Sequence, residues 1–178
     1  MREFYKTYEG KILTITQDNS HPGWITQTTG LEPKRILTEG LDIPLLKNGG
    51  VINLYVNDVH YRGLLFHEIG QYKSSLNITN AHKRMLDMRL DADFVIAGHT
   101  HIGDMEKPVK REGKPYLVQL GTFKTEDDYG DLRGLSPKPQ VFFPTLFFNG
   151  KRKNIEAIED REDANEIIEA LIAKAETK

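Results

Sequence analysis

Two histidines stand in the block Gly98-His99-Thr100-His101, directly after a short apolar run. The run, residues 93–97, is rich in Val, Ile and Phe and too short for a helix, so it predicts a buried strand. A glycine at its end would let the backbone turn sharply and approach a ligand closely. In extended backbone His99 and His101 would lie on one side, roughly 7 Å apart along the chain. Such a pair suits two metal ions about 3.5–4 Å apart, an arrangement used in phosphoester hydrolysis.

A third histidine ends an earlier apolar run. Gly63-Leu-Leu-Phe-His67 predicts a strand with a histidine at its end. A basic helix is expected at 80–87, and Val118-Gln-Leu-Gly-Thr-Phe-Lys124 contains a glycine at a further strand end. With Gly98-His99-Thr100-His101 between these two segments, the order resembles that of the calcineurin-like metallophosphoesterases. It is most similar to the phosphoesterases of bacteriophage and prophage genomes, over about residues 40–175.

The resemblance implies a fold, a reaction and a set of ligands. Family members are α+β proteins in which two mixed sheets form a layered β-sandwich flanked by helices, with metals at strand ends along one edge. By position, His67 and His99 would share one metal ion and His101 would face a neighbouring ion. One or two divalent ions, Mn²⁺, Fe or Zn²⁺, would activate water. That water would hydrolyse a phosphomonoester or phosphodiester substrate, with nucleic acids and nucleotides among the candidates.

The chain departs from the family in its N-terminal part. The family's Asp-x-His, Gly-Asp and Gly-Asn-His blocks supply a bridging aspartate, an asparagine ligand and the catalytic histidine, and none has a counterpart in the right order. Asp58-Val-His60 lies too close to Gly98 and between two apolar runs, so a hairpin turn is the better interpretation. Asn19-Ser-His21 lacks the preceding glycine, and Glu68 stands where the family usually has Gly. We therefore expect the chain to correspond to the C-terminal half to two-thirds of a phosphoesterase.

This departure leaves three functional hypotheses open. Three imidazoles without a carboxylate leave the charge of two divalent ions nearly uncompensated, which favours a single ion held by His67 and His99. The chain would then be a metallophosphoesterase by ancestry and reaction class but inactive alone, with no catalytic residue assigned. Alternatively, it is a non-catalytic interaction module on a truncated scaffold. The third hypothesis is one part of a split enzyme whose other polypeptide supplies the aspartates.

Other polar and aromatic residues have a structural interpretation beside a functional one. Asp104 could lie near the metals or cap a turn, while Thr122 and Lys124 could contact phosphate. The acidic segment 125–130 is interpreted as surface. The remaining histidines are expected on a helix surface, in a turn and in a loop: His82, His60 and His21. Four phenylalanines are expected in the core or an interface and not as a platform for bases: Phe142, Phe143, Phe147 and Phe148.

The composition fits one globular domain over residues 1–178. Hydrophobic residues make up 38% and charged residues 28%, which is unlike a disordered chain. The net charge of −2 and pI of about 6.3 indicate no extended basic surface for nucleic acid, but these values do not exclude a local basic groove. The absence of cysteine excludes disulfides and thiolate metal sites. No apolar run approaches the roughly 18 residues of a membrane span, and the first residues are unlike a signal peptide, so we expect a cytoplasmic protein.

Hairpins dominate the expected secondary structure. Two have their turns at Asn57-Asp58 and Asn149-Gly150, and a third has its turn at 111–114 between 108–110 and 115–120. The further elements expected, in chain order, are a strand at 11–16, an irregular loop at 17–30, a short helix at 33–37, a helix from 74–80 to about 90, and a last helix capped by Asp160 or Asp163. Hairpins with a few helices indicate an α+β layered fold.

Two apolar surfaces lead to an expectation about partners. The last helix has six apolar residues at helical spacing, predicted to form a buried stripe: Ala164, Ile167, Ile168, Leu171, Ile172 and Ala175. If the N-terminal half of the family fold is absent, the inner face of one sheet would be exposed, and a face of that size is normally covered by a partner. We therefore expect homo-oligomerisation or a missing polypeptide, and no membrane contact.

Overall fold

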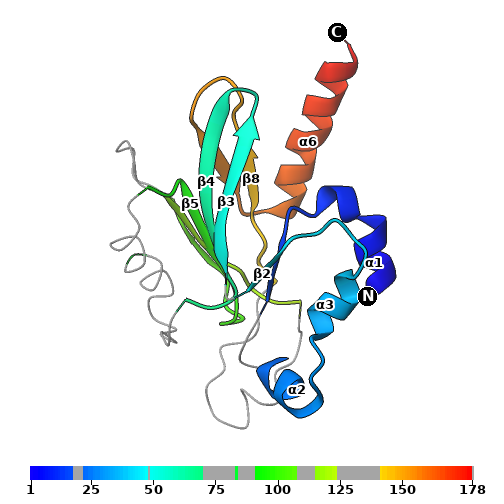
Figure 1. Ribbon diagram of the computed structural model, residues 1–178. Helices are drawn as coiled ribbons and strands as arrows, with labels where there is room; N and C mark the ends of the chain where they lie inside the picture. The colour runs from blue at the N-terminus through cyan, green and yellow to red at the C-terminus, as the bar shows by residue number, and fades with distance from the viewer. Residues whose placement is uncertain are drawn as a thin grey trace.

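The computed structural model describes residues 1–17, 22–47, 49–69, 83, 91–107, 115–123 and 141–177. The fold is α+β, with a central five-stranded mixed sheet, a second layer formed by a hairpin, and helices outside the sheets (Figure 1). The helices are α1 (Arg2–Thr7), the 3-10 helix η1 (Glu9–Lys11), α2 (Pro22–Thr29), α3 (Pro33–Thr38) and α6 (Arg161–Glu176). The strands are β1 (Ile15–Gln17), β2 (Leu45–Lys47), β3 (Gly50–Val56), β4 (Val59–Phe66), β5 (Phe94–Ala97), β6 (Asp104–Glu106), β7 (Tyr116–Gln119), β8 (Thr145–Phe148) and β9 (Ile155–Ile158).

The central sheet has the strand order β3-β4-β5-β7-β6. β3 and β4 form an antiparallel hairpin, and Asn57 in its turn has φ +52°, a conformation that asparagine adopts more readily than most residues. The hairpin predicted at Asn57-Asp58 is therefore confirmed. β4, β5 and β7 run parallel to one another, and β6 is antiparallel to β7. Because three neighbouring strands are parallel, their carboxyl ends meet at one edge of the sheet.

The β8–β9 hairpin covers one face of this sheet. Tyr61 of β4, Phe94 of β5 and Ile155 of β9 are buried and pack together. Phe148 of β8 meets the rings of Tyr61 and Phe94 edge to face, with centroids 5.0 and 5.3 Å apart. Gly63 makes room for this layer, because a Cβ there would overlap the Phe94 ring. The stacking of a hairpin on a sheet gives the layered arrangement expected from the sequence.

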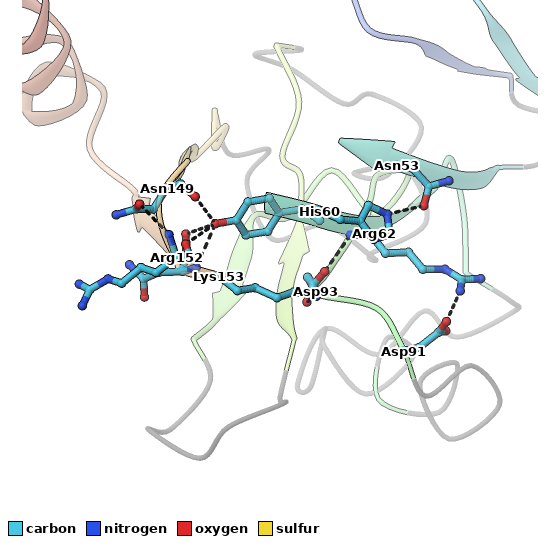
Figure 2. A network of polar contacts seen from close by, with 10 residues as sticks. Asn53, His60, Arg62, Asp91, Asp93, Asn149, Arg152 and Lys153 are labelled. Atoms are coloured by element: carbon cyan, nitrogen blue, oxygen red, sulfur yellow. Dashed lines mark hydrogen bonds and ion pairs between the residues drawn. The ribbon is translucent and has the colours of Figure 1, made fainter. Parts of the chain in front are cut away.

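The Tyr61 hydroxyl fixes the β8–β9 hairpin at its turn. It accepts a hydrogen bond from the main-chain N–H of Asn154 at 3.0 Å. The main-chain oxygens of Asn149, Arg152 and Asn154 lie 2.7, 3.0 and 2.9 Å from it, and its single proton can serve one of them at a time. Figure 2 labels Asn149 and Arg152 of this turn. The hairpin predicted at Asn149-Gly150 is confirmed, and this hydroxyl joins its turn to β4.

The opposite face of the central sheet is buried as well. Leu64, Val95 and Leu117 are 1%, 0% and 4% exposed and pack together. The expectation of an uncovered sheet face is therefore wrong for the described strands. The physical reason lies in β4 and β5, which carry apolar residues on both faces, as strands of a parallel sheet covered on both sides do.

The N-terminal region agrees with the prediction only in part. β1 is shorter than the strand expected at 11–16 and pairs in parallel with β2. α2 occupies much of the region expected to be a loop, so that prediction is wrong for 22–29. Pro22 stands at the first helical position, where its missing N–H would have no helical partner. α3 begins at Pro33 as predicted.

Two predicted elements fall largely outside the described residues. Residues 108–114, with the turn of the third hairpin, lie outside, but β7 does pair with an antiparallel strand, which is β6. The helix expected from 74–80 to about 90 also lies outside, except for Lys83, which is helical.

α6 confirms the predicted cap and corrects the predicted stripe. The Asp160 carboxylate accepts hydrogen bonds from the main-chain N–H groups of Glu162 and Asp163 at 2.7 and 3.1 Å. Ala164 is buried, but the four large apolar residues that follow are 39–55% exposed: Ile167, Ile168, Leu171 and Ile172. The buried stripe is therefore wrong beyond Ala164. In the part of the chain that the structure describes, no helix is both long and apolar enough to cross a membrane.

Candidate metal centre

Two parallel strands bring two predicted ligands to one edge of the sheet. Phe66, the last residue of β4, pairs with Ala97, the last residue of β5. His67 and Gly98 come next on each strand, and the N–H of Gly98 donates to the His67 oxygen at 3.1 Å. The pairing of the strands therefore continues one residue beyond the sheet. Ligands of open sheets that contain parallel strands commonly bind outside these carboxyl ends.

The imidazoles of His67 and His99 lie in direct contact. His67 Nε2 is 3.1 Å from His99 Nδ1, and the ring centroids are 5.2 Å apart at an interplanar angle of 74°. The His99 side chain is 17% exposed, so solvent reaches the pair. Two nitrogens that bind one tetrahedral ion at about 2.0–2.1 Å lie roughly 3.3–3.4 Å apart. The observed contact is a hydrogen bond between the two rings, and its length is close to that value, so release of its proton would leave two nitrogens spaced for one divalent ion.

Glu68 lies beside the other nitrogen of His99. Its Oε2 is 3.8 Å from His99 Nε2, within ion-pair range but longer than a hydrogen bond. A carboxylate on this side favours the tautomer in which Nε2 carries the proton and the Nδ1 lone pair faces His67. Histidines that bind metals commonly donate their second N–H to a carboxylate, which orients the ring. Glu68, seen in the sequence only as a departure from glycine, thus faces the outer nitrogen of His99.

The turn after β5 has an unusual backbone. His99 and His101 have φ of +80° and +61°, in the left-handed region that few residues other than glycine adopt. Gly98 is not among the residues with positive φ, so the left-handed backbone of the turn lies at the two histidines and not at the glycine. The N–H of Thr100 donates to the Gly98 oxygen at 3.1 Å, which closes the turn locally. Strained backbone of this kind concentrates at functional sites, where surrounding contacts hold it in place.

Gln119 holds this turn from the neighbouring strand. It ends β7, is 3% exposed, and its Nε2 donates to the Gly98 oxygen at 2.5 Å. The N–H of Leu120 also donates to the Ala97 oxygen at 2.7 Å. Gln119 was not among the residues predicted from the sequence, although a glutamine within an apolar strand is a signal of a buried polar contact.

The far side of the turn packs against the segment before β8. Gly103 lies against Phe142 so closely that a Cβ there would overlap the ring. The N–H of Gly121, just after β7, donates to the Phe142 oxygen at 2.9 Å. Phe142 therefore ties two loops of this edge together, which agrees with the structural interpretation of that phenylalanine.

His101 is the third predicted ligand. It is partly buried and follows His99 by two residues in the turn. Within the described ranges, no set of three His, Asp or Glu side chains is close enough to hold a metal ion. The structure thus brings His67 and His99 together, and the role of His101 as a ligand stays a prediction.

The remaining candidates lie apart from this pair or outside the described residues. The Asp104 carboxylate accepts from the N–H of the adjacent Met105 at 2.9 Å, in line with a local capping role. His60 Nε2 lies 2.8 Å from the Asn53 side-chain oxygen on the β3–β4 hairpin (Figure 2), so Asp58-Val-His60 serves the hairpin. Thr122 is partly buried after β7. The sequence candidates that lie outside the described ranges are His21, His82, Lys124 and 125–130.

The described residues also form a surface hollow of about 330 Å³ between α2 and α3. It is lined by residues of these two helices and the segment between and after them, and no histidine is among them. The hollow therefore does not belong to the histidine pair.

Comparison with known proteins adds distant structural likenesses. No family model matches the sequence, and no curated protein matches it. A predicted phosphoesterase from Streptococcus pneumoniae TIGR4 is similar with 14% identity and a TM-score of 0.48, over 89% of this chain and 80% of that chain. Wild-type Vps29 from Entamoeba histolytica, solved with Zn²⁺, is similar with 16% identity and a TM-score of 0.41, over 89% of each chain. With TM-scores below 0.5, these likenesses establish neither a function nor a ligand for this chain.

Proposed function

We propose that this chain is a metal-dependent phosphoesterase-type protein in which His67 and His99 hold one divalent ion. The observation that carries the proposal is the 3.1 Å separation of His67 Nε2 and His99 Nδ1 at the carboxyl ends of two parallel strands. Nitrogens that converge at this distance suit a shared ion. The order of the histidine blocks in the sequence, similar to that of calcineurin-like metallophosphoesterases, supports this reaction class.

The charge around the pair favours one ion over two. Two neutral imidazoles contribute no negative charge, and Glu68 is the carboxylate that faces His99, at 3.8 Å. One divalent ion beside one carboxylate leaves less uncompensated charge than two ions would. A second ion, held by His101, would need further carboxylates. Nitrogen ligands without cysteine suit Zn²⁺, Fe or Mn²⁺.

Each residue of the centre has a separate task in this proposal. His67 and His99 supply the ligand nitrogens, and Glu68 and Gln119 hold His99 in its orientation. A bound ion would polarise a phosphoester oxygen and lower the pKa of a coordinated water. The net charge of −2 offers no extended basic surface, so we propose a small phosphoester, such as a nucleotide, as substrate in preference to a long nucleic acid.

The test combines metal uptake with turnover. Zn²⁺ and Mn²⁺ binding are measured by calorimetry on the metal-free chain, and hydrolysis of bis(p-nitrophenyl) phosphate is followed with each metal. We expect His67→Ala and His99→Ala each to lose the tight site and the turnover. His60→Ala is the matched control, because His60 lies on the same β4 strand but is bonded to Asn53 at the hairpin. Variants at 67 and 99 that take up metal like the parent would overturn the proposal.

A non-catalytic interaction module is the second candidate. It is favoured by the position of Glu68, which faces the outer nitrogen of His99 and not the space between the two rings. Metal uptake that depends on His67 and His99, without turnover of any phosphoester offered, would support this candidate over the enzyme.

A further inference from the structure

The C-terminal helix has an apolar stripe that remains 39–55% exposed in the part of the chain that the structure describes. Ile167 and Ile168 are each 39% exposed, and Leu171 and Ile172 are 55% and 53% exposed. α6 contacts β9 near its beginning, where Ala164 is buried, and its C-terminal half stands clear of the sheets and of the other helices in Figure 1. The opposite side of the helix is acidic, with Glu162, Glu166 and Glu169 at helical spacing.

The spacing of this stripe is symmetric along the helix. Ile168 and Leu171 lie equally far from the midpoint between Glu169 and Ala170. The same holds for the outer pairs, which are Ile167 with Ile172 and Ala164 with Ala175. When two copies of such a helix pack antiparallel about this midpoint, each residue of a pair in one copy contacts the other residue of the same pair in the second copy. This is the property of an isologous two-fold interface, and an unrelated partner helix would not require it.

The charges that border the stripe are complementary in the same arrangement. Asp163 and Lys174 are eleven residues apart, about three turns, so they lie on the same side of the helix as Ile167. In an antiparallel pair, Lys174 comes to within about two residues, or 3 Å along the axis, of Asp163 of the second copy. Two reciprocal ion pairs would form along one edge. A parallel pair would instead place these two residues of the two copies on opposite edges of the contact, so Lys174 would not meet Asp163 of the second copy.

We propose that α6 is a self-association surface, and that its occupant is α6 of a second copy, packed antiparallel about the Glu169–Ala170 midpoint. Ile168 and Leu171 form the centre of the contact, Ile167 and Ile172 flank it, and Lys174 pairs with Asp163. The inference is independent of the metal centre. One helix per copy buries less than the roughly 1,200 Å² typical of stable interfaces, so the dimer is weak and depends on concentration.

The first experiment measures mass against concentration for the full chain by sedimentation equilibrium. We expect the weight-average mass to rise from 20.3 kDa toward twice that value. Leu171→Glu should raise the dimer dissociation constant about tenfold or more, because it sets a charge in the centre of the contact. Leu13→Glu is the matched control, since Leu13 is 65% exposed outside α6, and it should associate like the parent. Circular dichroism confirms that both variants fold.

The second experiment tests the orientation. Lys174→Asp and Asp163→Lys should each weaken the dimer, and the double variant should restore it. The chain has no cysteine, so a single introduced one reports contact without background. In the antiparallel pair Ala175→Cys lies about eleven residues, or 16 Å, from its equivalent and forms no disulfide, whereas Leu171→Cys, about 4.5 Å along the axis, does. A chain that stays monomeric at all concentrations, equal association of Leu171→Glu, or cross-linking through Ala175→Cys would each overturn the proposal.

Discussion

The side-chain amide of Gln119 donates to the main-chain oxygen of Gly98 at 2.5 Å, from the end of β7 to the turn that carries His99 and His101. The same oxygen accepts from the N–H of Thr100 at 3.1 Å, so both of its lone pairs are used. The turn with two left-handed histidines is therefore held by one buried polar side chain. We infer that Gln119 sets the position of the His99 ring relative to His67.

Replacing Gln119 by Met should destabilise the chain by about 0.5–1.5 kcal/mol, because a nearly isosteric apolar side chain removes one of the two hydrogen bonds that the Gly98 oxygen accepts. Urea unfolding measures this change. Metal affinity should fall as well, since the turn loses its support. Thr145→Val, at a partly buried position of β8 in the separate hairpin, should leave metal affinity unchanged. Unchanged affinity in Gln119→Met would contradict the positioning role.

Glu68→Gln should lower metal affinity about tenfold while leaving the fold intact, as is common when the carboxylate behind a ligand histidine is removed. The glutamine keeps the shape but loses the charge that faces His99 Nε2. Calorimetric titration with Zn²⁺ measures the effect. Glu159→Gln removes a carboxylate that pairs with Lys107 at 3.8 Å and serves as the control for net charge. Equal losses in both variants would show a general charge effect and remove the specific role of Glu68.

The backbone at His101 predicts an unusual order of stability for two variants. His101 has a φ of +61°. His101→Ala therefore keeps the energetic cost of the left-handed conformation, whereas His101→Gly removes it. We expect the glycine variant to be about 1 kcal/mol more stable than the alanine variant, measured by urea unfolding. At Asp104, a position without positive φ, the same pair of substitutions should favour alanine. An alanine variant at 101 as stable as the glycine variant would mean that the turn relaxes at no cost.

Local signals in the sequence predicted the parts of the fold that depend on neighbouring residues. The turns at Asn57 and Asn149-Gly150 lie between apolar strands, and both hairpins formed. The strand before Gly98 and the strand before His67 were predicted for the same reason, and their parallel pairing brings the two histidines together. The cap at Asp160 depends only on the following turn of helix.

The missed features depend on contacts between distant segments. Gln119 lies 21 residues from Gly98 in the sequence. Its side chain reaches the Gly98 oxygen only when β7 pairs with β5. Glu68 comes to face the His99 ring only when the turn after β5 folds back toward the end of β4. The stripe on α6 has the pattern of a buried face, but a pattern of residues does not say which surface covers it, and here most of it is open.

Comparing Tyr116→Phe with the parent should show how the stability contributed by the Tyr116 hydroxyl depends on pH. The Tyr116 hydroxyl donates to the Ile155 oxygen of β9 at 2.7 Å. Burial, followed by the negative charge of Glu156, raises the pKa of Tyr116 above its ordinary value of 10.0. At neutral pH the phenol is protonated in both the folded and the unfolded chain, and losing its hydrogen bond should cost about 0.5–1.5 kcal/mol.

Above pH 10 the unfolded chain releases this proton before the folded chain does, which favours unfolding. The stability that Tyr116 contributes is therefore complete below pH 10 and is lost as the pH rises through its folded pKa. We expect the difference between the parent and Tyr116→Phe to be constant below pH 10 and to shrink as the pH rises above 10, measured by urea unfolding at each pH. The comparison cancels the other tyrosines, which both chains share. A difference that stays constant over this range would mean that the hydroxyl ionises as readily in the folded chain as in the unfolded one.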